Sequence, residues 1–129
     1  MTREEEKTLL LKVLCAMLPY GVKGHLAGLD VRIEILGVNG NDIFCKPSLH
    51  GQELIRDIRY IKPYLRPMSS MTEEEKKEYD EFEFISASHF AHGIEAGELT
   101  EWLNSHHFDY RGLIEKGLAL PAPEGMYEV

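Results

Sequence analysis

The strongest constraint on the fold is an alternation of apolar and charged side chains in residues 30–36. Arg32 and Glu34 are the charged members, and an apolar residue lies on each side of them. The apolar positions are Val31, Ile33 and Ile35. A period of two residues is typical of a strand that buries one face and exposes the other. The segment therefore predicts a half-buried strand.

A turn and a returning strand follow this segment. Asn39, Gly40 and Asn41 are turn residues, and residues 42–46 are again mostly apolar, so the two segments predict a β-hairpin. Residues 20–26 favour a preceding strand. Residues 48–62 are ambiguous. Their isoleucine triplet suits a helical turn and their β-branched content suits a strand, so we expect a short turn that leads into an extended segment. The triplet is Ile55, Ile58 and Ile61.

Three helices are expected around these strands. The first covers residues 3–18, carries an apolar stripe and ends before Pro19. The second begins after Ser70 or Thr72, both of which fit a capping box, and runs to about Glu81. The third covers residues 98–106, and the glycine-rich tail from Asp109 is expected to dock on the core. The stripe of the first helix is Leu10, Val13, Leu14 and Met17.

These elements predict a single α+β domain over residues 1–129, with an N-terminal helix, a small antiparallel sheet, C-terminal helices and a docked tail. The short, sequential strands favour a sheet that curls towards an SH3-like barrel. No apolar run reaches the roughly 20 residues that cross a bilayer, and the acidic N-terminus differs from a secretory signal. We therefore expect a cytoplasmic protein with no membrane contact, and we expect Cys15 and Cys45 to be reduced and buried.

The charge distribution is uneven. The net charge is −8, but residues 46–71 sum to +3 and residues 72–83 sum to −5. The segment from 56 to 66 interleaves basic and aromatic side chains, a pattern that can track a phosphate backbone and stack on bases. Its candidate binding residues are Arg56, Arg59, Lys62, Tyr64 and Arg66. The net charge disfavours nucleic-acid binding, and the alternative is that the basic stretch pairs with the acidic segment after it.

The histidines suggest a second kind of site. His89 and His92 are three residues apart, a spacing that places both imidazoles on one face of a helix. With His106 as a third ligand they could hold a metal ion for hydrolysis. The alternative is that these imidazoles are satisfied by backbone groups or exposed, since the sequence has no HExxH motif.

Three longer phrases carry a family resemblance. They are LPYGVK at residues 18–23, IKPYLRPMSSMTEEEKKEY at residues 61–79, and WLNSHHFDYRGLIEKGLAL at residues 102–120. In this order they resemble a group of small uncharacterised proteins from Bacteroides-type gut bacteria and from their phages and prophages. The resemblance implies a phage-linked accessory protein that acts inside the bacterial host. It implies no activity, cofactor or catalytic residue.

The leading functional hypothesis is a non-catalytic protein that binds or regulates a partner protein without a cofactor. It depends on the lack of a catalytic motif, the segregated charge and a possible aromatic contact patch. The patch residues are Tyr64, Leu65, Trp102, Phe108 and Tyr110. The alternatives are a nucleic-acid-binding module that uses residues 56–66 and a metal-dependent hydrolase. The sequence leaves the oligomeric state open.

Overall fold

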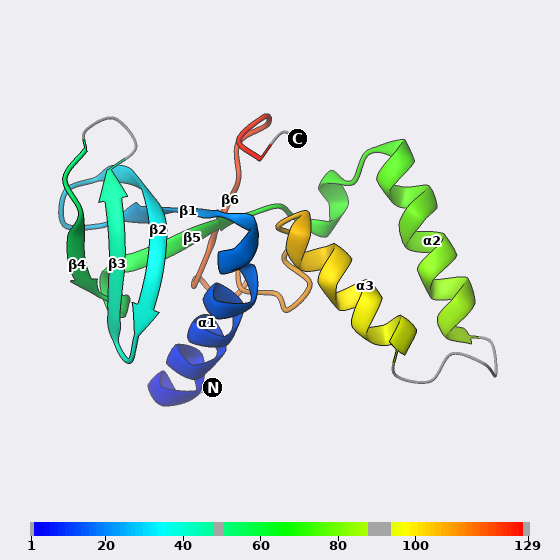
Figure 1. Ribbon diagram of the computed structural model, residues 1–129, viewed down its shortest axis with the longest axis horizontal. Coiled ribbons are helices and arrows are strands. Elements are labelled where there is room, and N and C mark those ends of the chain that lie inside the picture. The colour runs from blue at the N-terminus through cyan, green and yellow to red at the C-terminus, as the bar shows by residue number, and fades with distance from the viewer. Residues whose placement is uncertain (1, 48–50, 88–93, 128–129) are drawn as a thin grey trace.

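A computed structural model describes residues 2–47, 51–87 and 94–127, which form a sheet accompanied by α-helices (Figure 1). The helices are α1 (Arg3–Met17), α2 (Glu73–Ala87) and α3 (Ile94–Ser105). The strands are β1 (Val22–Leu26), β2 (Val31–Asn39), β3 (Asp42–Pro47), β4 (Leu54–Asp57), β5 (Ile61–Leu65) and β6 (Leu120–Pro121). Short 3-10 helices are η1 (Leu18–Tyr20), η2 (Ile58–Tyr60) and η3 (Met68–Ser70). The α+β prediction is confirmed.

The sheet has the strand order β4-β3-β2-β1-β5-β6. All neighbours pair antiparallel except β5 and β6. A bulge between Ile35 and Gly37 bends β2, which pairs with β1 on one side and with β3 on the other. In Figure 1, β1 and β5 run across the direction of β3 and β4. The first five strands are ordered β4-β3-β2-β1-β5, with η2 between β4 and β5, so the predicted small antiparallel sheet is present.

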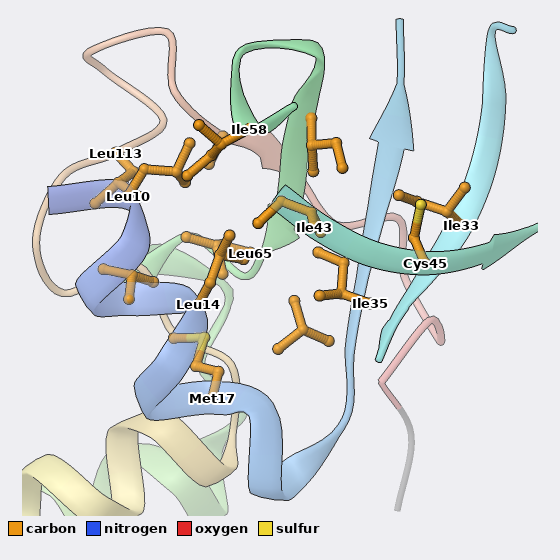
Figure 2. Packing of buried hydrophobic residues seen from close by; sticks show 14 of the residues in the cluster. Leu10, Leu14, Met17, Ile33, Ile35, Ile43, Cys45, Ile58, Leu65 and Leu113 are labelled. Atoms are coloured by element: carbon orange, nitrogen blue, oxygen red, sulfur yellow. The ribbon is translucent and has the colours of Figure 1, made fainter. Parts of the chain in front are cut away.

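Helix α1 supplies one side of the core. Thr2 caps it through a capping box with Glu5, and its apolar stripe is buried as predicted. Figure 2 shows Leu10 of α1 beside Leu113 of the C-terminal tail, and Leu14 beside Leu65 of β5. Burying a leucine or isoleucine side chain contributes about 1.5–3 kcal/mol, so this contact holds the helix on the sheet.

Several element boundaries differ from the predictions. The strand expected from Tyr20 begins at Val22, because Pro19 lies in the short helix η1. Helix α2 continues beyond Glu81 to Ala87. The described part of the ambiguous segment, residues 51–62, contains β4, η2 and the start of β5. Of the two cap candidates, Thr72 accepts from the backbone N–H of Glu75 at 3.1 Å, whereas the Ser70 hydroxyl donates to the Pro67 carbonyl.

The C-terminal tail docks on the core, as expected. Leu113 and Ala119 are buried, and β6 pairs in parallel with the end of β5. The Tyr127 hydroxyl accepts from the Lys23 N–H at 2.9 Å and lies 2.7 Å from the Tyr64 carbonyl oxygen. These groups lie just beyond the last paired residues of β1 and β5. Burial raises the pKa of Tyr127 to about 12, so its hydroxyl stays protonated at neutral pH. The tail therefore fastens the two strands where their ladder ends.

Two further findings concern the described residues. None of the helices in this part of the chain is long and apolar enough to cross a bilayer. Both cysteines are unpaired, and Cys45 is buried as predicted, but Cys15 is exposed. The prediction for Cys15 was wrong because its position lies off the stripe that α1 turns towards the sheet.

Candidate binding surfaces

The cations of the segment from 56 to 66 do not form one patch. They are divided among β4, η2, β5 and the residue after β5. Side chains alternate along β5, where Ile61, Pro63 and Leu65 are buried while Lys62 is exposed and Tyr64 half-buried. Each basic residue of the segment therefore has its own surroundings.

Arg66 is held inside the structure. Its two terminal nitrogens donate to the two carboxylate oxygens of Glu75 at 2.7 and 2.6 Å, and one of them also donates to the Ser70 carbonyl. The guanidinium lies over the ring of the fully buried Phe108, 4.3 Å from its centroid. Its hydrogen bonds lower the pKa of Glu75 to about 2. Arg66 therefore joins β5, the start of α2 and the chain after α3, and its charge is neutralised there.

Arg56 and Arg59 also have local partners. Arg56 Nη1 donates to the carbonyl of Ile55 at 2.9 Å. Arg59 Nε lies 3.6 Å from Asp57 Oδ1, and its guanidinium lies over the ring of the exposed Tyr60. Both arginines remain at the surface but turn towards their own segment. The predicted pairing of the basic stretch with the acidic helix is seen for Arg66.

Lys62 instead joins a different group, which we name the basic face. Lys62 on β5 and Arg32 on β2 both lie opposite His25 on β1, so the three form one row across three strands. A second row places Glu34 opposite both Lys23 and Lys46. The basic face comprises Lys23, His25, Arg32, Lys46 and Lys62. Sequence reasoning missed four of these because the cross-strand register brings them together.

Tyr64 lies beside the basic face. The guanidinium of Arg32 reaches across β1 to within 5.5 Å of the centre of the Tyr64 ring. Strand β1 lies between β2, which carries Arg32, and β5, which carries Tyr64. The contact therefore orients the Arg32 side chain along the row and not away from the sheet. Of the five predicted residues of segment 56–66, Lys62 and Tyr64 therefore contribute to a shared surface.

The predicted aromatic contact patch is mostly internal. Leu65 and Phe108 are fully buried. Trp102 is half-buried, where its ring meets those of Tyr79, Phe82, His106 and Phe108 and its Nε1 donates to Glu78 Oε2 at 2.7 Å. The Tyr110 hydroxyl donates to Asn104 Oδ1 at 2.9 Å. Trp102 and Tyr110 therefore connect the helices to the core, and the five residues make no common surface.

The predicted metal site is only partly visible, because His89 and His92 lie outside the described residues. The His106 ring packs against that of Trp102 at a tilt of 34°. Its Nδ1 lies 2.8 Å from the Trp102 carbonyl oxygen, and its Nε2 lies 3.9 Å from Glu75. Within residues 2–47, 51–87 and 94–127, no three histidine, cysteine or carboxylate side chains are grouped to hold a metal ion.

His107 has a structural role. It is buried at 6% exposure, and its Nε2 lies 2.5 Å from the Gly21 carbonyl oxygen. Its ring stacks on Tyr127, with 3.7 Å between the centroids. Burial lowers the pKa of His107, so the ring is neutral at physiological pH.

An exposed apolar group, which we name the edge patch, lies on the outer side of β2, β3 and β4. Phe44 is half-buried and lies opposite Ile55, which is 54% exposed. Leu36, at the bulge of β2, is 44% exposed. The edge patch comprises Leu36, Phe44 and Ile55. In the sequence, Ile55 belongs to a triplet with Ile58 and Ile61, which are buried. Side chains alternate between the two faces of β4, and this alternation directs Ile55 outward.

The edge patch adjoins an open edge of the sheet. Strand β4 pairs with β3, and across the described ranges no strand pairs with its other side (Figure 1). The opposite edge, β6, is only two residues long and ends in Pro121. Short strands and prolines protect sheet edges from pairing with other chains. Strand β4 has no proline, so it is the edge at which backbone groups remain available.

A surface cleft of about 720 Å³ lies between the start of α1 and η2. Its lining carries both signs of charge, and much of this charge is paired. Lys7 lies 3.5 Å from Glu4, and Arg59 is beside Asp57. The charged lining residues are Arg3, Glu4, Glu6, Lys7, Asp57, Arg59 and Lys62. Lys62 lines this cleft and also belongs to the basic face, so the two surfaces adjoin at Lys62.

Comparison with protein-family models, with curated proteins and with solved structures gave no match. The functional argument therefore depends on the geometry of this chain.

Proposed function

We propose that this protein is a non-catalytic binding module that engages a partner protein by accepting an extended segment of that partner as an added strand on β4. The observation that carries the proposal is the coincidence of an open strand edge with the edge patch. The three sequence segments that resemble phage-linked proteins support an accessory role in the cytoplasm of a bacterial host.

Strand addition uses two kinds of contact. The backbone N–H and C=O groups on the open side of an edge strand supply hydrogen bonds, and side chains in alternate positions supply specificity. On β4, the outward position in the middle of the strand is Ile55, which continues the apolar surface of Phe44. An added strand would place its own outward residue beside Ile55 and remove that side chain from water. Burial of an isoleucine contributes about 1.5–3 kcal/mol.

The charges around Ile55 indicate the chemistry of the segment. Glu53 and Asp57 lie two residues before and after it, so acidic groups flank the apolar position. Opposite charges on facing strands stabilise pairing, and like charges destabilise it. A suitable segment therefore has an apolar residue with lysine or arginine two positions away on each side. Because Arg56 and Leu54 face the other side of β4, an acidic and an apolar residue suit the intervening positions.

A labelled synthetic peptide tests this proposal. It has Lys-Glu-Val-Ile-Lys at its centre, ordered for antiparallel pairing with β4, and its binding is followed by fluorescence polarisation. We expect saturable binding that Ile55→Lys weakens at least tenfold. Leu29→Lys is the matched control, because Leu29 is 53% exposed but lies between β1 and β2. Equal binding of a scrambled peptide, or equal effects of the two substitutions, would contradict strand addition.

A further inference from the structure

We infer that the basic face is a second docking surface, which binds a short acidic segment of a protein. This surface lies on the outer side of β5, β1, β2 and β3, and its chemistry is opposite to that of the β4 edge. The inference is independent of strand addition, because it depends on charge complementarity and involves none of the edge-patch residues.

The geometry favours an extended acidic chain. Lys62, His25 and Arg32 lie opposite one another on three adjacent strands. Neighbouring strands are about 4.8 Å apart, so the row is about 10 Å long. Alternate side chains of an extended peptide repeat at about 7 Å. The row is about 3 Å longer than this repeat, but the guanidinium of Arg32 reaches across β1 to Tyr64, towards the strand of Lys62. Two carboxylates on one side of such a peptide can therefore meet the charged ends of Lys62 and Arg32.

The cations of this face remain available. Within the described part of the chain, no carboxylate forms an ion pair with Arg32, Lys46 or Lys62. Arg32, Lys46 and Lys62 are exposed. The acidic helix α2 takes Arg66 but does not neutralise the basic face. Although the net charge of the chain is −8, this face presents Arg32, Lys46 and Lys62 without a carboxylate partner among the described residues.

The carboxylates near the face set the length of the ligand. His25 Nε2 lies 2.6 Å from Asp30 Oδ1 at one end, and Glu34 lies between Lys23 and Lys46. A long polyanion would extend from the face over a molecule that is otherwise strongly acidic, where like charges repel it. A short acidic peptide can remain within the rows. The observations therefore favour an acidic protein segment over a nucleic acid.

The experiment measures binding of a fluorescein-labelled peptide with six alternating aspartates and glutamates to the whole protein at low salt. We expect saturable binding that weakens as salt is raised, because salt screens exposed charges. The double substitution Arg32→Glu with Lys62→Glu should weaken binding about tenfold or more. The control, Lys12→Glu with Lys77→Glu, makes the same change in net charge on exposed positions of α1 and α2 and should leave binding within about twofold.

Two controls distinguish a loss of binding from a loss of folding. Circular dichroism reports whether each variant is folded, and the milder double substitution Arg32→Gln with Lys62→Gln removes the two charges without reversing them. The milder pair should retain the fold and weaken binding in the same direction. No saturable binding at low salt would overturn the inference, as would equal losses in the test and control pairs. Tighter binding of a single-stranded oligonucleotide with six phosphates than of the peptide would also overturn it. We expect these variants to leave binding of the β4 peptide unchanged, so the two proposals can fail separately.

Discussion

The guanidinium of Arg66 and the carboxylate of Glu75 face each other through two parallel hydrogen bonds of 2.7 and 2.6 Å. Both side chains are mostly shielded from water, with exposures of 19% and 14%. Glu75 also accepts from the Thr72 N–H at 2.9 Å, which completes the cap of α2. One carboxylate thus fixes both the start of a helix and the end of β5.

Glu75→Gln is expected to lower the free energy of unfolding by about 1.5–3 kcal/mol at pH 7, the range for hydrogen bonds to charged groups. Glutamine keeps the capping box, so the change isolates the ion pair. Urea unfolding at pH 7 measures the loss. Glu74→Gln is the control, because Glu74 is exposed on the same turn, and it should change stability by less than about 0.5 kcal/mol.

The same pair predicts a pH dependence. The pKa of Glu75 falls from 4.5 to about 2 on folding. A carboxyl with a depressed folded pKa stabilises the protein above its unfolded pKa, and this contribution is lost as the pH falls. The difference between wild type and Glu75→Gln should therefore shrink between about pH 4.5 and pH 2. A difference that stays constant over this range would show that the ion pair does not stabilise the fold.

His107 predicts a second pH effect in a different range. Because burial lowers its pKa from 6.5, the unfolded chain takes up a proton at a higher pH than the folded chain. Acidification below about pH 6.5 therefore favours unfolding. His107 also has a left-handed φ of 62°, which asparagine tolerates. His107→Asn should remove this pH dependence, measured by urea unfolding at pH 7.5 and pH 5.5. An unchanged slope would exclude His107 as its source.

Tyr127 predicts the strength of the tail contact. Tyr127→Phe removes the hydroxyl that accepts from the Lys23 N–H, and an unsatisfied buried donor costs about 1–3 kcal/mol. Unfolding in urea should show this loss, and the Lys23 amide should exchange faster with solvent. Tyr60→Phe is the control, because Tyr60 is 44% exposed and should change stability by less than about 0.5 kcal/mol. Equal effects of both substitutions would argue against the hydroxyl bridge.

The elements of this fold were largely predictable because their patterns are local. The alternation around Ile33 and the apolar stripe around Leu14 each report on a few neighbouring residues. The boundaries were less predictable where two local tendencies compete. Pro19 disfavours helical geometry in the residue before it, yet it also fits the first turn of a 3-10 helix. In the structure α1 ends at Met17 and Pro19 lies in η1, which delays the start of β1 to Val22.

The surfaces were less predictable because they depend on register. In sequence, Arg66 looks like any other cation of its segment, and only the approach of α2 gives it Glu75. Lys62 and Arg32 are thirty residues apart, and their row exists because both strands pair with β1. Ile55 appeared to share a face with Ile58, but the change from strand to 3-10 helix separates them.

The most direct test of the central claim is amide hydrogen exchange in β4, with and without the peptide that has Lys-Glu-Val-Ile-Lys at its centre. Strand addition places new hydrogen bonds on the open side of β4, so the amides of residues 54–57 that face this side should exchange at least tenfold more slowly with saturating peptide. Ile55→Lys should abolish the protection, and Leu29→Lys should retain it. Peptide binding without added protection in β4 would contradict the account.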